Sequence, residues 1–296
     1  MQDRLRAHVS ALVGERHPVS SPAQLAQAGQ YLADRFKGLG LAVADHAFDA
    51  YGRTFRNVIA TIPGTDAALP PLLIAAHYDT VPDSPGADDN ASGLAVMLEA
   101  ARSLVDRPLA CPVRFIGFCL EEDNLRGSRA YAEQLRAAHQ PILGMIALEC
   151  VGYARHEEGS QGKPPGLPVA VPTTGDFLGM IGNETAAPLV AALAQAATGL
   201  APVLTHVPLL VPGRGEQLPD ARRSDHAAFW DQDYPAVMLT DTANFRNPHY
   251  HQPTDVIATL DFHFMARVAE ALAAAISDLA MRPRCPDGGR SGVPAP

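Results

Sequence analysis

The stretch Leu72-Leu73-Ile74-Ala75-Ala76 is wholly apolar, and it runs directly into His77-Tyr78-Asp79. A short apolar run of this kind is typical of a strand that is covered on both faces. Similar runs recur along the chain and alternate with segments of helical apolar spacing. The predicted strands after 72–76 are 113–120, 142–148 and 236–240, and the predicted helices are 92–104, 128–138, 184–198 and 262–281. The alternation indicates an α/β fold with three layers (α/β/α) around a central mixed, mainly parallel sheet.

Two helices and two strands are predicted before this stretch. Leu5, Val9 and Leu12 keep helical spacing, and Ser21 is the expected N-cap of a second helix that ends near residue 38. Strand-like segments follow at 41–48 and 55–62, and long loops at 155–174 and 209–223 are expected to shape a surface cleft. The tail 283–296 is rich in Pro and Gly and is expected to be disordered, which leaves 1–282 as a single domain.

The composition excludes several classes of function. The chain has 296 residues, of which 47% are hydrophobic and 19% charged, so it can bury a sizeable core. A formal charge of -9 argues against nucleic acid or an anionic membrane surface as the main partner. No apolar stretch reaches the ~18 residues of a spanning helix, and the N-terminal residues lack the apolar core of a signal peptide, so a cytoplasmic location is expected.

The four cysteines indicate neither a disulfide framework nor a thiolate zinc site, because they lack Cys-x-x-Cys spacing. Cys111, Cys119 and Cys150 are expected to be buried and reduced.

Charged or metal-liganding residues follow each predicted core strand. They are His77 and Asp79, then Glu121 and Glu122, then Glu149, and finally Asp241. In open α/β sheets, ligands bind in the crevice beyond the carboxyl ends of the strands. Carboxylates and an imidazole gathered there would repel one another or titrate abnormally unless a cation lay between them. Mixed histidine and carboxylate ligands favour zinc over magnesium or calcium.

Five segments, in order along the chain, carry a resemblance to a known family. They are Ala76-His77-Tyr78-Asp79-Thr80-Val81-Pro82, then Asp88-Asp89-Asn90-Ala91-Ser92-Gly93, Glu121-Glu122-Asp123-Asn124-Leu125-Arg126-Gly127-Ser128, Leu148-Glu149-Cys150-Val151-Gly152 and Tyr250-His251-Gln252-Pro253-Thr254-Asp255. Together they resemble metallopeptidase family 28, the co-catalytic di-zinc aminopeptidases, whose relatives include the glutaminyl cyclases. The resemblance implies a zinc-aminopeptidase-like fold, also described as phosphorylase/hydrolase-like, and a zinc peptidase catalytic domain over 1–282.

The resemblance also implies which residues hold metal. The implied zinc ligands are His77, Asp89, Glu122, Glu149 and His251. In the family the bridging carboxylate directly precedes the Asn/Asp-x-Ser-Gly stretch, which selects Asp89 over Asp88. A His-x-x-x-Asp pattern ending at Asp255 selects His251, whereas the residues alone leave His249 and His226 as competitors. Glu149 stands where aspartate is more usual in the family.

Further roles follow from the same resemblance. Glu121 is implied to be the general base, Asp79 the carboxylate that orients the His77 imidazole, and Tyr250 a hydrogen-bond donor to the scissile carbonyl oxygen, with core packing as the alternative for Tyr250. Asp225 and His226 match a segment beside the family's substrate pocket. Ser224 does not form a hydrolase triad with them, because consecutive residues cannot adopt that geometry, and no Gly-x-Ser-x-Gly elbow is present.

The implied function is zinc-dependent removal of the N-terminal residue from peptides with a free N-terminus, with two Zn²⁺ per chain. One alternative is a glutaminyl-cyclase-like acyltransferase with one zinc, which the single Trp230 disfavours because few aromatic residues are available to line its pocket. A second is a non-catalytic peptidase-like scaffold without zinc. A lid-bearing carboxypeptidase or deacylase would need an inserted domain for which the chain has no room. The sequence predicts neither the oligomeric state nor the preferred substrate side chain.

Overall fold

The central sheet has eight strands in the order β1-β2-β4-β3-β5-β8-β6-β7 in a computed structural model, which describes residues 1–167 and 169–281. The strands are β1 (Ala42–Ala50), β2 (Arg53–Ile62), β3 (Leu72–His77), β4 (Val113–Phe118), β5 (Gly144–Glu149), β6 (Leu178–Asn183), β7 (His206–Val211) and β8 (Ala236–Thr240). The pairs β3–β4, β3–β5, β5–β8 and β6–β7 are parallel, and the other pairs are antiparallel. The predicted mixed, mainly parallel α/β sheet is therefore confirmed.

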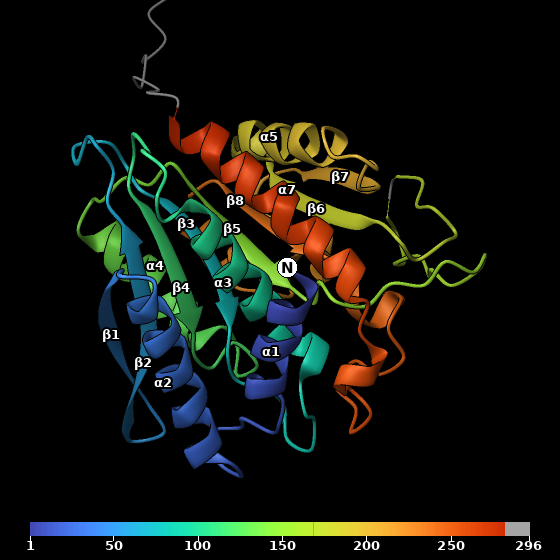
Figure 1. Cartoon of the computed structure of the whole chain (residues 1–296), viewed down its shortest axis with the longest axis horizontal. Coiled ribbons are helices and arrows are strands. Elements are labelled where there is room, and N and C mark those ends of the chain that lie inside the picture. Colours follow the sequence, from blue (N-terminus) through green and yellow to red (C-terminus); the bar gives the residue numbers. More distant parts are fainter. Residues whose placement is uncertain (168, 282–296) are drawn as a thin grey trace, which may run out of the picture.

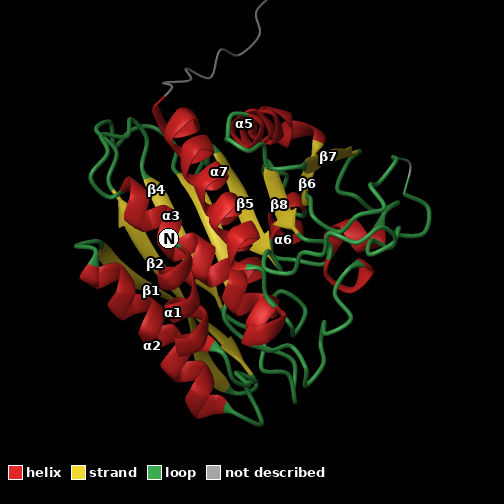
Figure 2. Ribbon diagram, turned by 45° about the vertical axis from the view of Figure 1, so that its right-hand side comes forward, coloured by secondary structure: helices red, strands yellow, loops and turns green. Residues whose placement is uncertain are grey.

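Helices cover both faces of this sheet (Figures 1 and 2). One face carries α1 (Gln2–Leu12), α2 (Pro22–Gly38), α3 (Gly93–Leu104), α5 (Ala187–Thr198) and α7 (Phe262–Met281), and the other carries α4 (Arg126–Ala137) and α6 (His226–Trp230). Side chains of β3 alternate between the two cores: Leu72 and Ile74 pack into the first, and Leu73 and Ala75 into the second. Because both faces are covered, every residue of this strand is buried, which explains the apolar run.

The structure adds elements that the sequence pattern did not predict. Strands β6 and β7 and the short helix α6 were not expected, and residues 209–211, predicted to lie in a loop, belong to β7. Gly179 and Gly182 weaken the strand signal of β6. Pro208 does the same in β7, where it is tolerated because β7 lies at the edge of the sheet.

Several smaller predictions have mixed outcomes. Ser21 precedes α2, but its side chain makes no cap hydrogen bond and instead accepts one from the His17 backbone N–H. Cys111, Cys119 and Cys150 are buried and unpaired, as predicted. Cys285 and the tail 283–296 lie outside the described residues. In the described part of the chain, no helix is both long enough and apolar enough to cross a membrane.

A buried carboxylate joins α1 to α3. Glu99 of α3 is fully buried, and its two oxygens accept hydrogen bonds from Arg4 of α1 at 3.0 Å and from Arg102 at 3.1–3.2 Å. Burial by itself would raise the pKa of Glu99, but His8, Arg4 and Arg102 together lower this pKa to about 2. The carboxylate is therefore ionised over the whole neutral range and holds α1 on the core.

We expect Glu99→Gln to lower the free energy of unfolding by about 1–2 kcal/mol near neutral pH, after discounting the ~1.4 kcal/mol per pKa unit for the partly exposed arginines. The pKa is lower in the folded chain than the ~4.3 of an unfolded glutamate, so this stability is present above that value and is lost as the pH falls toward about 2. Urea unfolding of both proteins near neutral pH and at about pH 3 checks this. The ionised role of Glu99 would be contradicted if the difference in unfolding free energy between wild type and Glu99→Gln stayed constant with pH. An equal loss of stability in Glu133→Gln, a variant at an exposed site, would also contradict it.

Candidate metal centre

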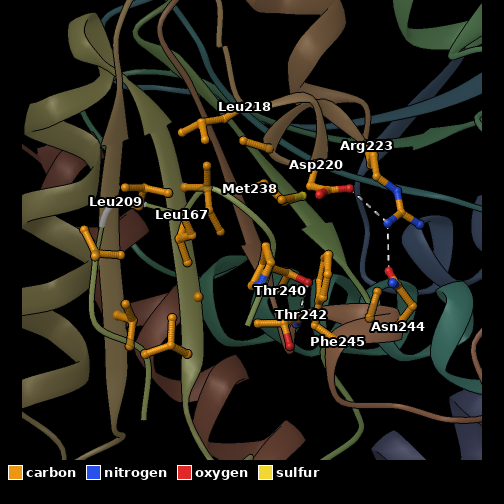
Figure 3. A pocket seen from close by; sticks show the side chains of 18 of the residues that line it. Leu167, Leu209, Leu218, Asp220, Arg223, Met238, Thr240, Thr242, Asn244 and Phe245 are labelled. Carbon is orange, nitrogen blue, oxygen red and sulfur yellow. Dashed lines mark hydrogen bonds and ion pairs between the residues drawn. The ribbon is translucent and has the colours of Figure 1, made fainter. Parts of the chain in front are cut away.

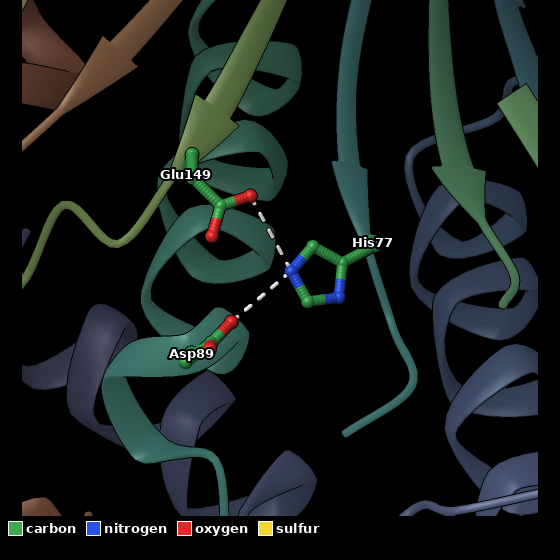
Figure 4. A group of neighbouring side chains, drawn as sticks. All are labelled: His77, Asp89 and Glu149. Atoms are coloured by element: carbon green, nitrogen blue, oxygen red, sulfur yellow. Dashed lines mark ion pairs between the residues drawn. The ribbon is translucent and has the colours of Figure 1, made fainter. Parts of the chain in front are cut away.

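Four polar side chains converge at one edge of the sheet. Because β3, β4 and β5 run parallel, their carboxyl ends meet at the same edge. His77 is the last residue of β3, Glu149 is the last residue of β5, and Glu121 follows β4 closely. The irregular helical turn η1 (Ala87–Ser92) lies just before α3 and brings Asp89 to the same point. Figure 4 shows His77, Asp89 and Glu149 facing one another from β3, η1 and β5.

The donor atoms form two groups that share one carboxylate. His77 Nε2 lies 3.1 Å from Asp89 Oδ1 and 3.4 Å from Glu149 Oε2. His251 Nε2 lies 3.1 Å from Asp89 Oδ2 and 3.2 Å from Glu122 Oε2. The two oxygens of Asp89 thus face two different imidazoles. A third possible group overlaps the others and joins His77 to Glu121 and Glu122.

These atoms fit a bound cation better than they fit one another. Six of them are buried without a hydrogen-bond partner in the described chain: both ring nitrogens of His77, both oxygens of Asp89, Glu122 Oε1 and His251 Nε2. Buried polar atoms are ordinarily paired, and leaving them unpaired is costly. Ligand atoms that share one tetrahedral zinc ion at ~2.0–2.2 Å stand about 3.3–3.6 Å apart, close to the separations seen here. The buried His, Asp and Glu groups can therefore hold metal.

The electrostatics of the cluster support this interpretation. Burial raises the pKa of Glu121 well above its usual value and, with Asp89 adding to the effect, raises that of Glu122 to about 7. Burial would lower the pKa of His251, but Asp89 and Glu122 raise it to about 10. Each group thus depends on the charge of its neighbours. Divalent cations among the carboxylates would remove this conflict.

The backbone beside the cluster is strained at three residues that are not glycine. Leu120, Cys150 and His251 have φ values of 60°, 49° and 59°. Such left-handed conformations are uncommon for side chains of this kind and concentrate at functional sites, where surrounding structure enforces them. Leu120 directly precedes Glu121 and Cys150 directly follows Glu149, so the left-handed residues lie next to residues of the cluster.

Two aspartates hold the backbone that carries the donor residues. Asp79 accepts hydrogen bonds from the backbone N–H groups of Glu121 at 3.0 Å and Glu122 at 3.1 Å. Its Oδ1 lies 3.6 Å from His77 Nδ1, so the predicted neighbour of the imidazole also positions the segment after β4. Asp255 accepts from the backbone N–H groups of Asp88 and Asp89.

Asn90 is a supporting residue that the sequence reasoning missed. Its side-chain amide donates to the Leu148 carbonyl at 2.8 Å, and its oxygen accepts from the backbone N–H groups of Cys150 and Gly93. These bonds tie η1 to the end of β5. The only feature of the sequence that could have indicated this role is the position of Asn90 directly after Asp89 in the segment Asp88–Gly93.

Several candidate residues face away from the cluster. Asp88 turns from the donor atoms and accepts hydrogen bonds from Gly152 N–H and from Asn247. Asp241, the charged residue after β8, accepts from the backbone N–H groups of Tyr153 and Ala243. His249, one of the competing imidazoles, is hydrogen-bonded to Thr254. Asp89 therefore lies at the cluster and Asp88 does not. In the same way, His251 lies at the cluster and His249 does not.

His226 and Asp225, which match a segment beside the family's substrate pocket, are both buried. His226 is fully buried, its Nε2 lies 2.8 Å from the Ala221 carbonyl oxygen, and its ring packs edge-on against Trp230 at 4.5 Å. Burial lowers the pKa of His226 to about 4, so the ring is neutral. Asp225 is also buried, in the electrostatic field of His77 and Glu149, and burial raises its pKa to about 7. Neither side chain lines the apolar cavity that opens beside the cluster.

An apolar cavity opens beside the cluster (Figure 3). Its volume is about 160 Å³, against the ~10–15 Å³ that a single water molecule needs. The inner wall includes Leu209, Leu218 and Met238, whereas Glu149 and Tyr250 line the side toward the donor groups. The predicted loops at 155–174 and 209–223 both contribute residues to this wall, in line with the expectation that they shape a cleft.

Arg223 stands at the rim of this cavity and joins several residues. It donates to Asn244 at 2.7 Å and lies 3.6 Å from Asp220 (Figure 3). It also donates to the Tyr250 hydroxyl oxygen at 3.2 Å. The Tyr250 ring stacks on His251 with 3.9 Å between ring centroids and 16° between planes. Burial raises the pKa of Tyr250 well above its usual value, so its phenol stays protonated.

A cluster of His, Asp and Glu donors at the carboxyl edge of a mainly parallel α/β sheet is typical of a metallohydrolase-like protein. The family model described as Peptidase family M28 matches residues 57–276. The chain belongs to this family, and the predicted resemblance is confirmed. The matched region begins in β2 and ends in α7, so it contains the whole cluster but not α1, α2 or β1.

The chain is also similar in sequence to several curated proteins. The chain is 31% identical over 286 residues to "Uncharacterized protein YfbL" of Escherichia coli (strain K12), covering 91% of this chain and 86% of that protein. It is 27% identical to a "Probable leucine aminopeptidase" of Arthroderma otae over 77% of this chain, and it spans 58% of that protein's length.

Solved structures share the fold. A zinc aminopeptidase from Bacillus subtilis superposes with a TM-score of 0.73 at 17% identity, over 95% of both chains. A glutaminyl cyclase from Porphyromonas gingivalis superposes with a TM-score of 0.69 at 20% identity, over 94% of this chain and 98% of the other. At these identities the likeness concerns the fold alone.

Proposed function

We propose that this chain is a zinc-dependent aminopeptidase that removes an apolar N-terminal residue from peptides. The observation that carries this proposal is the apolar cavity that opens directly onto the shared donor cluster at Glu149 and Tyr250. A side chain held in the cavity places the adjoining peptide bond next to the cluster.

The five residues predicted as ligands would hold two zinc ions. His77, Asp89 and Glu149 form one group, and Asp89, Glu122 and His251 form the other. Zinc supplies a Lewis acid for the carbonyl oxygen and lowers the pKa of a water molecule to roughly 7, so that a nucleophile is available near neutral pH.

Glu121 is the proposed general base. It belongs to neither of these two groups, yet its Oε2 lies only 3.8 Å from His77 Nε2. Its carboxylate takes the proton of the attacking water and delivers it to the leaving amide nitrogen. Burial favours a raised pKa at Glu121, which suits a group that both accepts and returns a proton.

Tyr250 is proposed to donate its phenolic hydrogen to the carbonyl oxygen as negative charge develops there. Because Arg223 donates to the phenolic oxygen, the proton of Tyr250 remains available for a second partner. Stacking on His251 holds the ring beside the donor group that contains Glu122. A donor aimed at developing charge contributes more in such a buried setting than in water.

The cavity and the cluster together define the substrate class. Leucine-sized or aromatic first residues would fill a wall built from side chains such as Leu209, Leu218 and Met238, whereas a charged side chain would lose its hydration there. Glu121 lies outside the two donor groups that share Asp89, and its carboxylate favours the cationic ammonium group of a free N-terminus over an acylated one.

A panel of short peptides tests the proposal. Peptides that begin with Leu, Phe, Ala or Glu are compared, each with a free and with an acetylated N-terminus, with zinc and with excess chelator. We expect release of the first residue only from free N-termini, a Leu-over-Ala preference in kcat/KM of about 10–200-fold, and loss of activity in chelator that zinc restores.

Three results would overturn the proposal. Equal cleavage of acetylated and free peptides would exclude an aminopeptidase. Cyclisation of a peptide that begins with Gln, without release of its first residue and with one zinc per chain, would identify a cyclase. The absence of both turnover and bound zinc would identify a non-catalytic scaffold.

A further inference from the structure

Arg16 is a buried cation close to the metal centre, and it comes from outside the part of the chain that the family model matches. It lies between α1 and α2, whereas the match begins at residue 57. The side chain is only 1% exposed and is among the largest fully buried side chains of the protein. Burial lowers the pKa of Arg16 to about 10, so the guanidinium is charged near neutral pH.

The guanidinium is hydrogen-bonded to both ends of the segment 78–86, which connects β3 to η1. It donates to the backbone carbonyl oxygens of Tyr78 at 2.9 Å, Pro85 at 3.0 Å and Gly86 at 3.1 Å. The backbone N–H of Arg16 donates to Thr80 Oγ1 at 2.9 Å, and the N–H of Gly14 donates to the Pro85 carbonyl at 2.8 Å. The remaining guanidinium bonds go to the carbonyls of Leu12 and Gly14, which anchor the group on its own side.

This segment sets the distance between two donor residues. His77 directly precedes the segment, and Asp89 follows it by three residues. Gly86 adopts a φ of 60° there, and a Cβ on Gly86 would come within 2.8 Å of Arg16 Nη2 and 2.4 Å of the Asp89 carbonyl oxygen. The Arg16 side chain and the backbone next to Asp89 are thus fitted to each other.

A structural role alone leaves the charge of Arg16 unexplained. Each guanidinium hydrogen bond given above ends on a neutral carbonyl, and a buried charge without an ionic partner is costly. The negative groups with an electrostatic effect on Arg16 are Asp79, Asp89, Asp255 and Glu122, all of which belong to or support the donor cluster.

We propose that Arg16 is a positioning residue of the metal centre, which fixes segment 78–86 so that His77 and Asp89 face each other at the spacing that one cation requires. This inference rests on the proposed binding of zinc. The N-terminal segment therefore contributes to metal affinity as well as to the core. Only a planar group with five donors can serve these diverging carbonyls, and a lysine ammonium cannot.

Arg16→Lys tests the inference, because it keeps the positive charge and removes the fork of donors. Zinc affinity is measured by competition with a chromophoric chelator, using the full chain. We expect a loss of about 10–100-fold, the range seen when a partner that orients metal ligands is removed. The control is Val9→Ala in α1, which destabilises the same region of the core through a buried side chain and should leave zinc affinity unchanged.

The outcomes separate the two proposals. If wild type binds no zinc in this titration, the proposed function fails. If wild type binds zinc and Arg16→Lys binds it equally well, or if Val9→Ala loses as much affinity, the inference about Arg16 is wrong. Should Arg16→Lys not fold, Thr80→Val removes only the hydrogen bond to the Arg16 backbone; we expect a smaller loss of zinc affinity in the same direction, and an unchanged affinity would overturn the inference.

Discussion

Glu121→Gln should lower kcat by about 10²–10⁴-fold while the protein keeps its full complement of zinc, because a general base typically contributes that much to the rate. Glutamine fills nearly the same volume and leaves intact the two donor groups that share Asp89. It cannot accept a proton from water or return one to the leaving nitrogen. KM should change little, since the cavity that holds the substrate side chain is not altered. Steady-state kinetics on a free leucyl peptide, together with zinc analysis, measures both quantities.

A matched control for this variant is Glu133→Gln, an exposed glutamate on α4, which should keep wild-type kcat. Unchanged activity in Glu121→Gln would remove the proposed base. Loss of zinc together with activity would instead make Glu121 a ligand, as in the third possible donor group with His77 and Glu122.

Asp89→Ala should abolish the binding of both zinc ions and all measurable peptidase activity. Its two carboxylate oxygens face His77 at 3.1 Å and His251 at 3.1 Å, so one substitution damages both donor groups. We expect zinc affinity to fall by more than the ~100-fold that loss of an orienting partner can cost. The stabilisation by excess zinc, ~2.7 kcal/mol at a concentration of 100 Kd, should also disappear from thermal unfolding curves.

Two variants give this experiment its controls. Asp88→Asn changes the neighbouring buried carboxylate, which bonds to Gly152 and Asn247 and belongs to neither donor group, so zinc stoichiometry should be retained. His251→Ala removes a ligand from one group only and should leave about half of the bound zinc. If Asp89→Ala still bound two zinc ions, or if Asp88→Asn lost as much zinc as Asp89→Ala, Asp89 would not be a carboxylate shared by both sites.

The strands that carry the cluster were predictable because both of their faces are covered. Burial on two faces requires nearly continuous apolar runs, and these are visible in β3, β4, β5 and β8, interrupted only by Arg114 in β4. Strands β6 and β7 gave no such signal. Gly179, Gly182 and Pro208 interrupt their pattern, and β7 is only partly buried at the edge of the sheet. Pairing with neighbours distant in the chain overrides these local preferences.

The donor residues were predictable for a related reason. Parallel strands deliver the residues at their carboxyl ends to one edge, so polar residues directly after apolar runs converge. His77, Glu121, Glu122 and Glu149 all follow this rule. Asp89 and His251 do not follow core strands, and only the motif resemblance singled them out. The bound metal, its number and the catalytic roles of these residues remain predictions for the experiments above.

The sequence by itself determined the sheet, the edge at which chemistry-bearing side chains meet and the family, because these depend on local pattern and on short motifs. Tertiary structure alone decided which neighbours face the cluster. Asp88 and His226 are hydrogen-bonded away from the cluster. Asp79 and Asp255 accept hydrogen bonds from backbone N–H groups. Arg16 is hydrogen-bonded to the segment between His77 and Asp89. The physical reason is that a side chain's direction and hydrogen-bond partners depend on how segments distant in sequence pack together, and no local pattern encodes them.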